Sequence, residues 1–114
     1  MSHQDPHSDD YKKMMRFLNE IEQGIRIANR EIIHAHIPIL EKDTVLAFAV
    51  AIARLRARYL EAAFRAAGID KGEPLDQNQV NQLRVHREAY EEAKIAFEAL
   101  RYAIEQGYVS IDVS

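Results

Sequence analysis

The sequence contains no cysteine and no tryptophan, and only four of its 114 residues are glycine and three are proline. Without cysteine the chain can form no disulfide and carry out no thiolate chemistry. The scarcity of helix breakers, together with abundant Ala, Glu, Arg, Leu and Ile, favours helices. The longest apolar run, 45–53, is ended by Arg54 and is too short to span a membrane. We therefore expect a small all-α protein with an apolar core.

Several other features are absent, and each absence excludes a class of function. The net charge of −3 disfavours a general nucleic-acid or membrane-surface binder. No glycine-rich phosphate loop, nucleophile elbow or His-Glu-x-x-His motif occurs. Serine and threonine fall only where caps or tails are expected, so no nucleophilic triad can be assembled. We expect no cofactor and no catalytic chemistry. The polar N-terminal residues do not have the pattern of a signal peptide, so we expect a cytoplasmic location.

Hydrophobic spacing predicts three parts: a disordered arm at 1–7, a three-helix domain at 8–107 and an extended tail at 108–114. The first helix is expected at about 9–37, with Ser8 or Asp9 as its N-cap. Pro38 should either end the helix or kink it, in which case it would continue to Lys42. Its apolar residues alternate between spacings of four and three, which is a heptad stripe that we expect to face the other helices. The stripe comprises Met14, Leu18, Ile21, Ile25, Ala28, Ile32 and Ala35.

The second helix is expected at about 44–67, capped by Asp43 or Thr44 and stopped by Gly68. Apolar residues occupy nearly half of its circumference, which is more than one partner helix requires. We interpret it as the central helix, in contact with at least two others.

The third helix is expected at about 77–106. Asp76 and Gln79 have the spacing of a capping box, and Gly107 supplies a stop. The tail alternates apolar and polar residues, and we expect a strap across the bundle or a strand paired with another copy, since no partner strand is evident in this chain. The predicted fold is an antiparallel three-helix bundle that assembles into a larger helical bundle.

Charge is unevenly distributed between the second and third helices. Residues 45–67 hold four arginines and one glutamate, whereas 73–107 hold four basic and seven acidic residues. We expect the two helices to pair charges across their edges. An alternative is that Arg54, Arg58 and Arg65 form a stripe that binds phosphate or another anion. Arg56 falls within the apolar arc, so it either extends its head to water or is a buried charge that needs a partner.

Two further groups of residues could carry chemistry. Glu31 and His34 have the Glu-x-x-His spacing of carboxylate-bridged di-metal bundles, but they lie away from the heptad stripe and lack a second motif unless a homodimer supplies it. His86 falls in the apolar stripe of the third helix. It is either a core residue with its hydrogen bonds satisfied or a switch that loosens the bundle when it becomes charged below about pH 6.

The surplus of apolar surface favours a protein–protein interaction or assembly module, with a twofold homodimer as the simplest closure. Two alternatives stay open: a ligand- or metal-binding helical bundle, and a nucleic-acid-associated regulator that uses the arginine stripe. The expected interface residues are Met15, Ile33, Ile37, Leu46 and Phe64.

Overall fold

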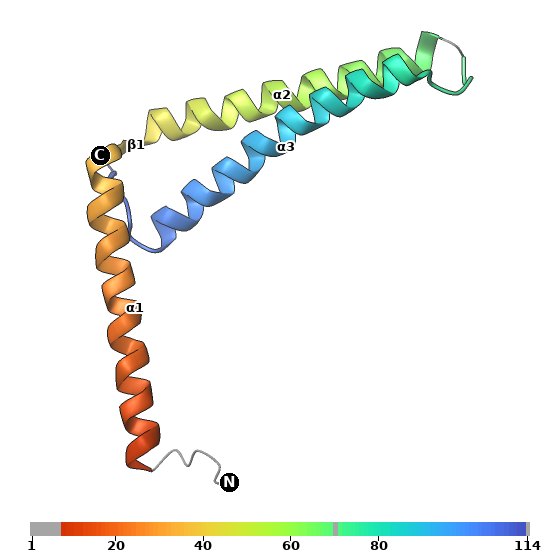
Figure 1. Cartoon of the computed structure of the whole chain (residues 1–114). Coiled ribbons are helices and arrows are strands. Elements are labelled where there is room, and N and C mark those ends of the chain that lie inside the picture. The colour runs from red at the N-terminus through yellow and green to blue at the C-terminus, as the bar shows by residue number, and fades with distance from the viewer. Residues whose placement is uncertain (1–7, 70, 114) are drawn as a thin grey trace.

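A computed structural model describes residues 8–69 and 71–113, without the side chain of Ile69. The expected disordered arm at 1–7 lies outside the described residues. Three long helices account for most of the chain, so the predicted all-α class is confirmed (Figure 1). In chain order the elements are α1 (Asp9–His36), β1 (Leu40–Glu41), α2 (Lys42–Ile69), α3 (Gln77–Glu105) and β2 (Ile111–Asp112). The helix bounds lie within two residues of the expected ones.

Both ends of α1 follow from local chemistry. The Ser8 side chain accepts a hydrogen bond from the backbone N–H of Tyr11 at 3.0 Å, so Ser8 is the N-cap. The helix ends at His36, where Ile37 donates its N–H to the carbonyl of Ile33 at 2.7 Å. Pro38 then prevents continuation, because its ring clashes with the preceding turn. The kinked extension that the sequence left open does not form.

The capping box of α3 is confirmed atom by atom. Asp76 Oδ1 accepts from the N–H of Gln79 at 2.8 Å, and Gln79 Oε1 accepts from the N–H of Asp76 at 2.8 Å. Two donors that lack partners within the helix are thereby satisfied. At the other end Gly107 adopts a φ of 74°, and Tyr108 donates its N–H to the carbonyl of Ala103 at 2.9 Å, as a glycine stop requires.

The predicted ends of α2 are wrong, because the helix extends two residues further at each end. The helix begins at Lys42, so Asp43 lies inside the first turn and is not the cap. At the other end Gly68 remains helical, and the left-handed residues are Lys71 at φ 50° and Gly72 at φ 94°. The apolar periodicity continues to Ile69, and a glycine within a helix costs too little to stop it there.

Helices α2 and α3 form a hairpin, joined at the end that carries residues 71–76 (Figure 1). Phe48 meets Phe97 edge to face with ring centroids 5.4 Å apart. Further along, Arg56 contacts Tyr90. The partners therefore run in opposite sequence order along the two helices. Toward the other end of the hairpin the helices diverge, and α1 meets them there at a corner.

The corner is built by a short parallel sheet between β1 and β2. Leu40 pairs with Ile111, and the Leu40 N–H donates to the carbonyl of Ser110 at 2.7 Å. Leu40 and Val109 are two of the four buried apolar residues in the described chain, at 7% and 6% exposure respectively. The expectation that the tail has no partner strand within the chain is therefore wrong, because the linker after Pro38 supplies one.

The chain is far more extended than a closed bundle. Its radius of gyration is 23.1 Å and its extents are 71 × 48 × 20 Å, whereas a compact chain of this length has a radius of gyration of about 13 Å. It exposes 9370 Å², compared with roughly 6,400 Å² for a compact folded chain of this mass. The packing that the sequence predicts among three helices is made here by α2 and α3, while α1 projects away from them (Figure 1).

Candidate assembly interface

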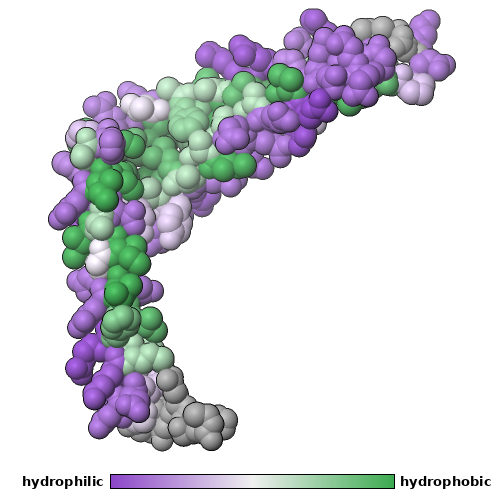
Figure 2. Space-filling view, in the orientation of Figure 1, coloured by the Kyte–Doolittle hydropathy of each residue, from purple (hydrophilic) through white to green (hydrophobic). Residues whose placement is uncertain are grey.

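The heptad stripe of α1, called the α1 stripe below, is uncovered along its length. No residue of α1 is buried, and Leu18, Ile21, Ile25 and Ile32 are 47–63% exposed. Figure 2 shows a band of hydrophobic residues along this helix. The stripe was expected to pack inside the bundle. In the structure it is instead a free amphipathic face.

The side of α1 that approaches the rest of its own chain is a different one. Gln23, Arg26, Ile27 and Arg30 line a hollow together with the turn after α3, at Gln106 and Gly107. At 100° per residue these four α1 residues are centred roughly 170° from the α1 stripe. The α1 stripe therefore points away from its own hairpin.

Helix α2 also carries apolar residues on a side that α3 does not cover. Leu46, Val50, Leu60 and Phe64 are 54%, 46%, 59% and 84% exposed, respectively. This side is centred roughly 140° around the helix from the residues that pack on α3. We call it the α2 outer stripe, and it comprises Leu46, Val50, Ala53, Ala57, Leu60 and Phe64.

The spacings within the α2 outer stripe are again four and three, so it is a second heptad stripe. Leu46 and Phe64, both expected at an interface, belong to this stripe.

A third apolar surface, the corner groove, lies where the three helices meet. It has a volume of about 560 Å³, and residues from all three helices line it: Ile33, Ile37, Val45, Phe48, Leu100 and Ala103, with Leu40 and Val109 at its base. The structure therefore places the predicted interface residues in three regions. Ile33 and Ile37 lie in the corner groove, Leu46 and Phe64 on the α2 outer stripe, and Met15 near the start of α1, where it is 37% exposed.

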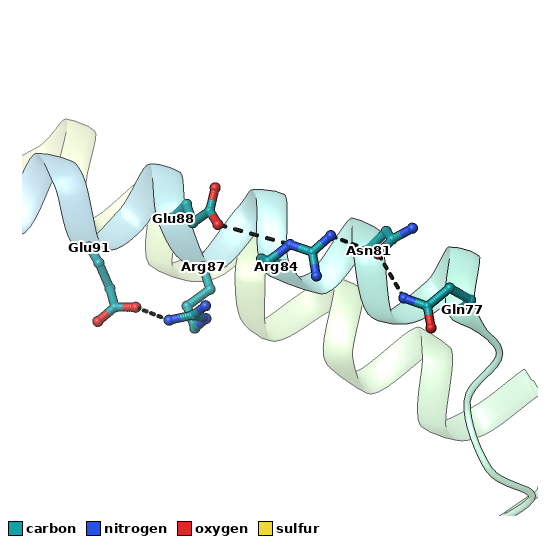
Figure 3. Close-up of polar contacts among 6 residues, drawn as sticks. All are labelled: Gln77, Asn81, Arg84, Arg87, Glu88 and Glu91. Atoms are coloured by element: carbon teal, nitrogen blue, oxygen red, sulfur yellow. Dashed lines mark hydrogen bonds and ion pairs between the residues drawn. The ribbon is translucent and has the colours of Figure 1, made fainter.

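The outer side of α3, by contrast, is polar in the half nearest the hairpin loop (Figure 3). Gln77 and Arg84 each donate to Asn81 Oδ1, at 3.0 and 2.7 Å. Two ion pairs continue the series, Arg84 with Glu88 at 4.0 Å and Arg87 with Glu91 at 2.8 Å. This part of α3 is a solvated surface. Val85 and Ile95 of α3 are also exposed, at 64% and 58%, but the continuous apolar stripes lie on α1 and α2.

The expected charge pairing between α2 and α3 is not observed. Within residues 8–69 and 71–113, each of the four ion pairs joins residues four apart on one helix. Pairs at this spacing need no alignment of two helices, and each is worth only a few tenths of a kcal/mol. The opposite charges of α2 and α3 therefore do not set their pairing.

Arg56 is exposed, so the buried charge considered from the sequence does not occur. Its partner is neither a carboxylate nor a carbonyl. The guanidinium donates to the hydroxyl oxygen of Tyr90 on α3, from Nε at 3.1 Å and Nη2 at 2.8 Å. Its position on the helix places Arg56 beside α3, and its guanidinium group remains exposed to solvent.

The three arginines of the proposed anion stripe are separated into two settings. Arg58 and Arg65 line an open hollow of about 320 Å³ with the half-buried His86. Glu61 lies in the same hollow, 3.5 Å from Arg65, and reduces its positive charge. Arg54 is exposed and does not line this hollow. The anion site and the His86 switch stay predictions.

Glu31 and His34, the candidate metal ligands, are both exposed on α1. In the described part of the chain no three His, Asp or Glu side chains gather as a metal-binding group. One copy therefore brings no further ligand to these two residues, and a di-metal site stays a prediction that needs a second copy.

No protein-family model matches the sequence, and comparison with curated proteins and with solved structures gives no match. Within the described residues, no helix combines the length and apolar character needed to cross a membrane.

Proposed function

We propose that this protein is a helical assembly module that associates with a second copy of itself and has no catalytic chemistry of its own. The observation that carries the proposal is the 28-residue helix α1, which is amphipathic yet has no buried residue. A helix of this kind gains most of its stability from packing its apolar face. Within residues 8–69 and 71–113, no part of its own chain covers this face.

The energetics favour association over an exposed stripe. Burying an isoleucine or leucine side chain contributes roughly 1.5–3 kcal/mol, and the α1 stripe holds one leucine and three isoleucines. Two copies bury two such stripes. The free energy gained by this burial can exceed the roughly 4–15 kcal/mol that association costs in lost translational and rotational freedom. The excess surface of about 3,000 Å² per copy is also larger than the roughly 800 Å² that each partner of a standard interface buries.

The proposal is tested by sedimentation equilibrium of the purified chain between about 1 and 100 µM, a range that brackets a micromolar Kd. The expected mass at the upper end is twice 13.1 kDa. Ile25→Glu, which places a charge in the α1 stripe, should give the monomer mass.

The matched control is Gln23→Glu, which adds the same charge to the opposite side of α1 and should leave the dimer intact. Circular dichroism of each variant shows whether the helices are retained. A wild-type chain that remains monomeric at about 100 µM contradicts the proposal, because an interface of this size should hold at that concentration.

A further inference from the structure

We infer that the dimer forms by reciprocal exchange, in which the α1 stripe of each copy docks antiparallel on the α2 outer stripe of the other. This inference rests on the proposed function, since it specifies how the two copies pair. Each copy then contributes α1 to a three-helix layer completed by the partner's α2 and α3. The predicted three-helix packing is thus made between chains rather than within one.

The first argument is a symmetry between the two helices. Helix α1 spans Asp9–His36 and α2 spans Lys42–Ile69, and each has 28 residues. Their bounds are therefore placed symmetrically about Ile39, in the middle of the linker. When two corners stack about a twofold axis near this residue, each α1 lies along the full length of the partner's α2 and runs in the opposite direction.

The same alignment brings the two stripes into register. It pairs residues whose numbers are equidistant from Ile39. Six of the seven residues of the α1 stripe then meet a residue of the α2 outer stripe, and the seventh, Ala35, falls opposite Asp43. Large residues meet at the ends, and isoleucines meet alanines in the middle, which permits close packing. The layers are Met14–Phe64, Leu18–Leu60, Ile21–Ala57, Ile25–Ala53, Ala28–Val50 and Ile32–Leu46, with the second residue of each pair from the partner.

Charged residues beside the two stripes give an independent argument that α1 runs antiparallel to the partner's α2. Glu22 directly follows stripe residue Ile21, and Arg54 directly follows stripe residue Ala53. In the antiparallel alignment Glu22 and the partner's Arg54 face each other along one edge. In a parallel alignment of the same stripes Arg54 would instead lie beside Phe17, and no opposite charges would meet across either edge. Neither Glu22 nor Arg54 has an ion-pair partner among the described residues.

The geometry of the corner favours exchange between two copies over folding of α1 back onto its own α2. Pairing of β1 with β2 holds the linker extended directly before α2. With the linker held in this way, the α1 stripe points away from its own hairpin. Folding back would require the linker to reverse and the parallel pair to open, whereas a second copy can dock without either change.

Cysteine cross-linking tests the arrangement cleanly, because the wild-type chain has no cysteine. Ile25→Cys combined with Ala53→Cys places thiols in one layer of the proposed pairing. On mild oxidation we expect a covalent dimer on a denaturing gel. The register control, Ile25→Cys with Leu60→Cys, is displaced by one heptad and should cross-link at least tenfold more slowly.

Three outcomes would overturn the exchange. Loss of free thiols in the double variant without a covalent dimer would show that α1 folds back within its chain. A covalent dimer from Ile25→Cys alone would show that α1 pairs with α1 instead. Equal cross-linking in the register control would show that the alignment about Ile39 does not hold. In each case the native mass of the wild-type chain still decides separately whether the chain self-associates.

A charge exchange provides a second measurement that does not depend on thiols. Glu22→Arg and Arg54→Glu should each raise the dimer Kd roughly tenfold at low salt, since each turns two attractive contacts per dimer into repulsive ones. The double variant should return the Kd to within about twofold of wild type. Additive weakening in the double variant would overturn the proposed edge contact and its direction.

Discussion

The guanidinium of Arg56 lies against the ring of Tyr90, with Cζ 5.1 Å from the ring centroid and two N–H groups donating to the hydroxyl oxygen. This is the one side-chain hydrogen-bonding contact that links α2 and α3 in the described residues. It joins the two helices near the middle of each. The remainder of their contact is apolar and less directional.

Removing the Tyr90 hydroxyl should therefore destabilise the hairpin measurably. We expect Tyr90→Phe to lower the free energy of unfolding by about 1 kcal/mol, because the hydrogen bonds are lost while the ring contact remains. Tyr102→Phe is the control, since its hydroxyl has no hydrogen-bond partner in the described chain. Urea unfolding at one fixed protein concentration measures both variants. Equal stabilities of the two variants would show that the Arg56 contact contributes nothing.

The capping box offers a second prediction at the start of α3. Asp76→Ala removes the acceptor for the Gln79 N–H and should lower the free energy of unfolding by about 1 kcal/mol. Asn78→Ala, inside the first turn of the same helix, is the control, because the Asn78 side chain has no hydrogen-bond partner among the described residues. Thermal unfolding followed by circular dichroism compares them. The prediction fails if Asp76→Ala melts at the temperature of the control.

The corner gives the third prediction. Leu40 is 7% exposed at the base of the corner groove, so Leu40→Ala should cost about 2–3 kcal/mol of stability. Hydrogen exchange should also become faster at the amide that Leu40 donates to Ser110, since the strand pair loses its apolar support. Val113→Ala, at a residue that is 87% exposed, should change neither quantity. Unchanged exchange in Leu40→Ala would mean that the strand pair does not depend on this side chain.

The helices were predictable because their determinants are local. A three-four apolar spacing, the Ser8 cap, the Asp76–Gln79 box and the Gly107 stop all act within one or two turns. The cap, the box and the stop are each confirmed by a hydrogen bond or a backbone angle, and the spacing is confirmed by the helix bounds. Where a local signal was weak, as for Gly68, the prediction of the helix end was wrong.

The arrangement of the helices was not predictable from the same signals. The pairing of Leu40 with Ile111 joins residues 71 positions apart in register. The alternation in the tail indicated a possible strand, but the two residues of β1 carry no pattern that identifies them as its partner. The direction of α1 follows from this pairing, not from the pattern on α1 itself. Periodicity shows that a stripe needs a partner, but it does not show whether that partner belongs to the same chain.

The parallel pairing at the corner also constrains the order of events during synthesis. Strand β2 follows α3 in the chain, so the linker after α1 cannot be held extended until α3 has left the ribosome. Until then a newly made α1 is free to swing and has no fixed angle to α2. The orientation of α1 is therefore set late in folding, by a contact of long sequence separation, after the helices themselves have formed.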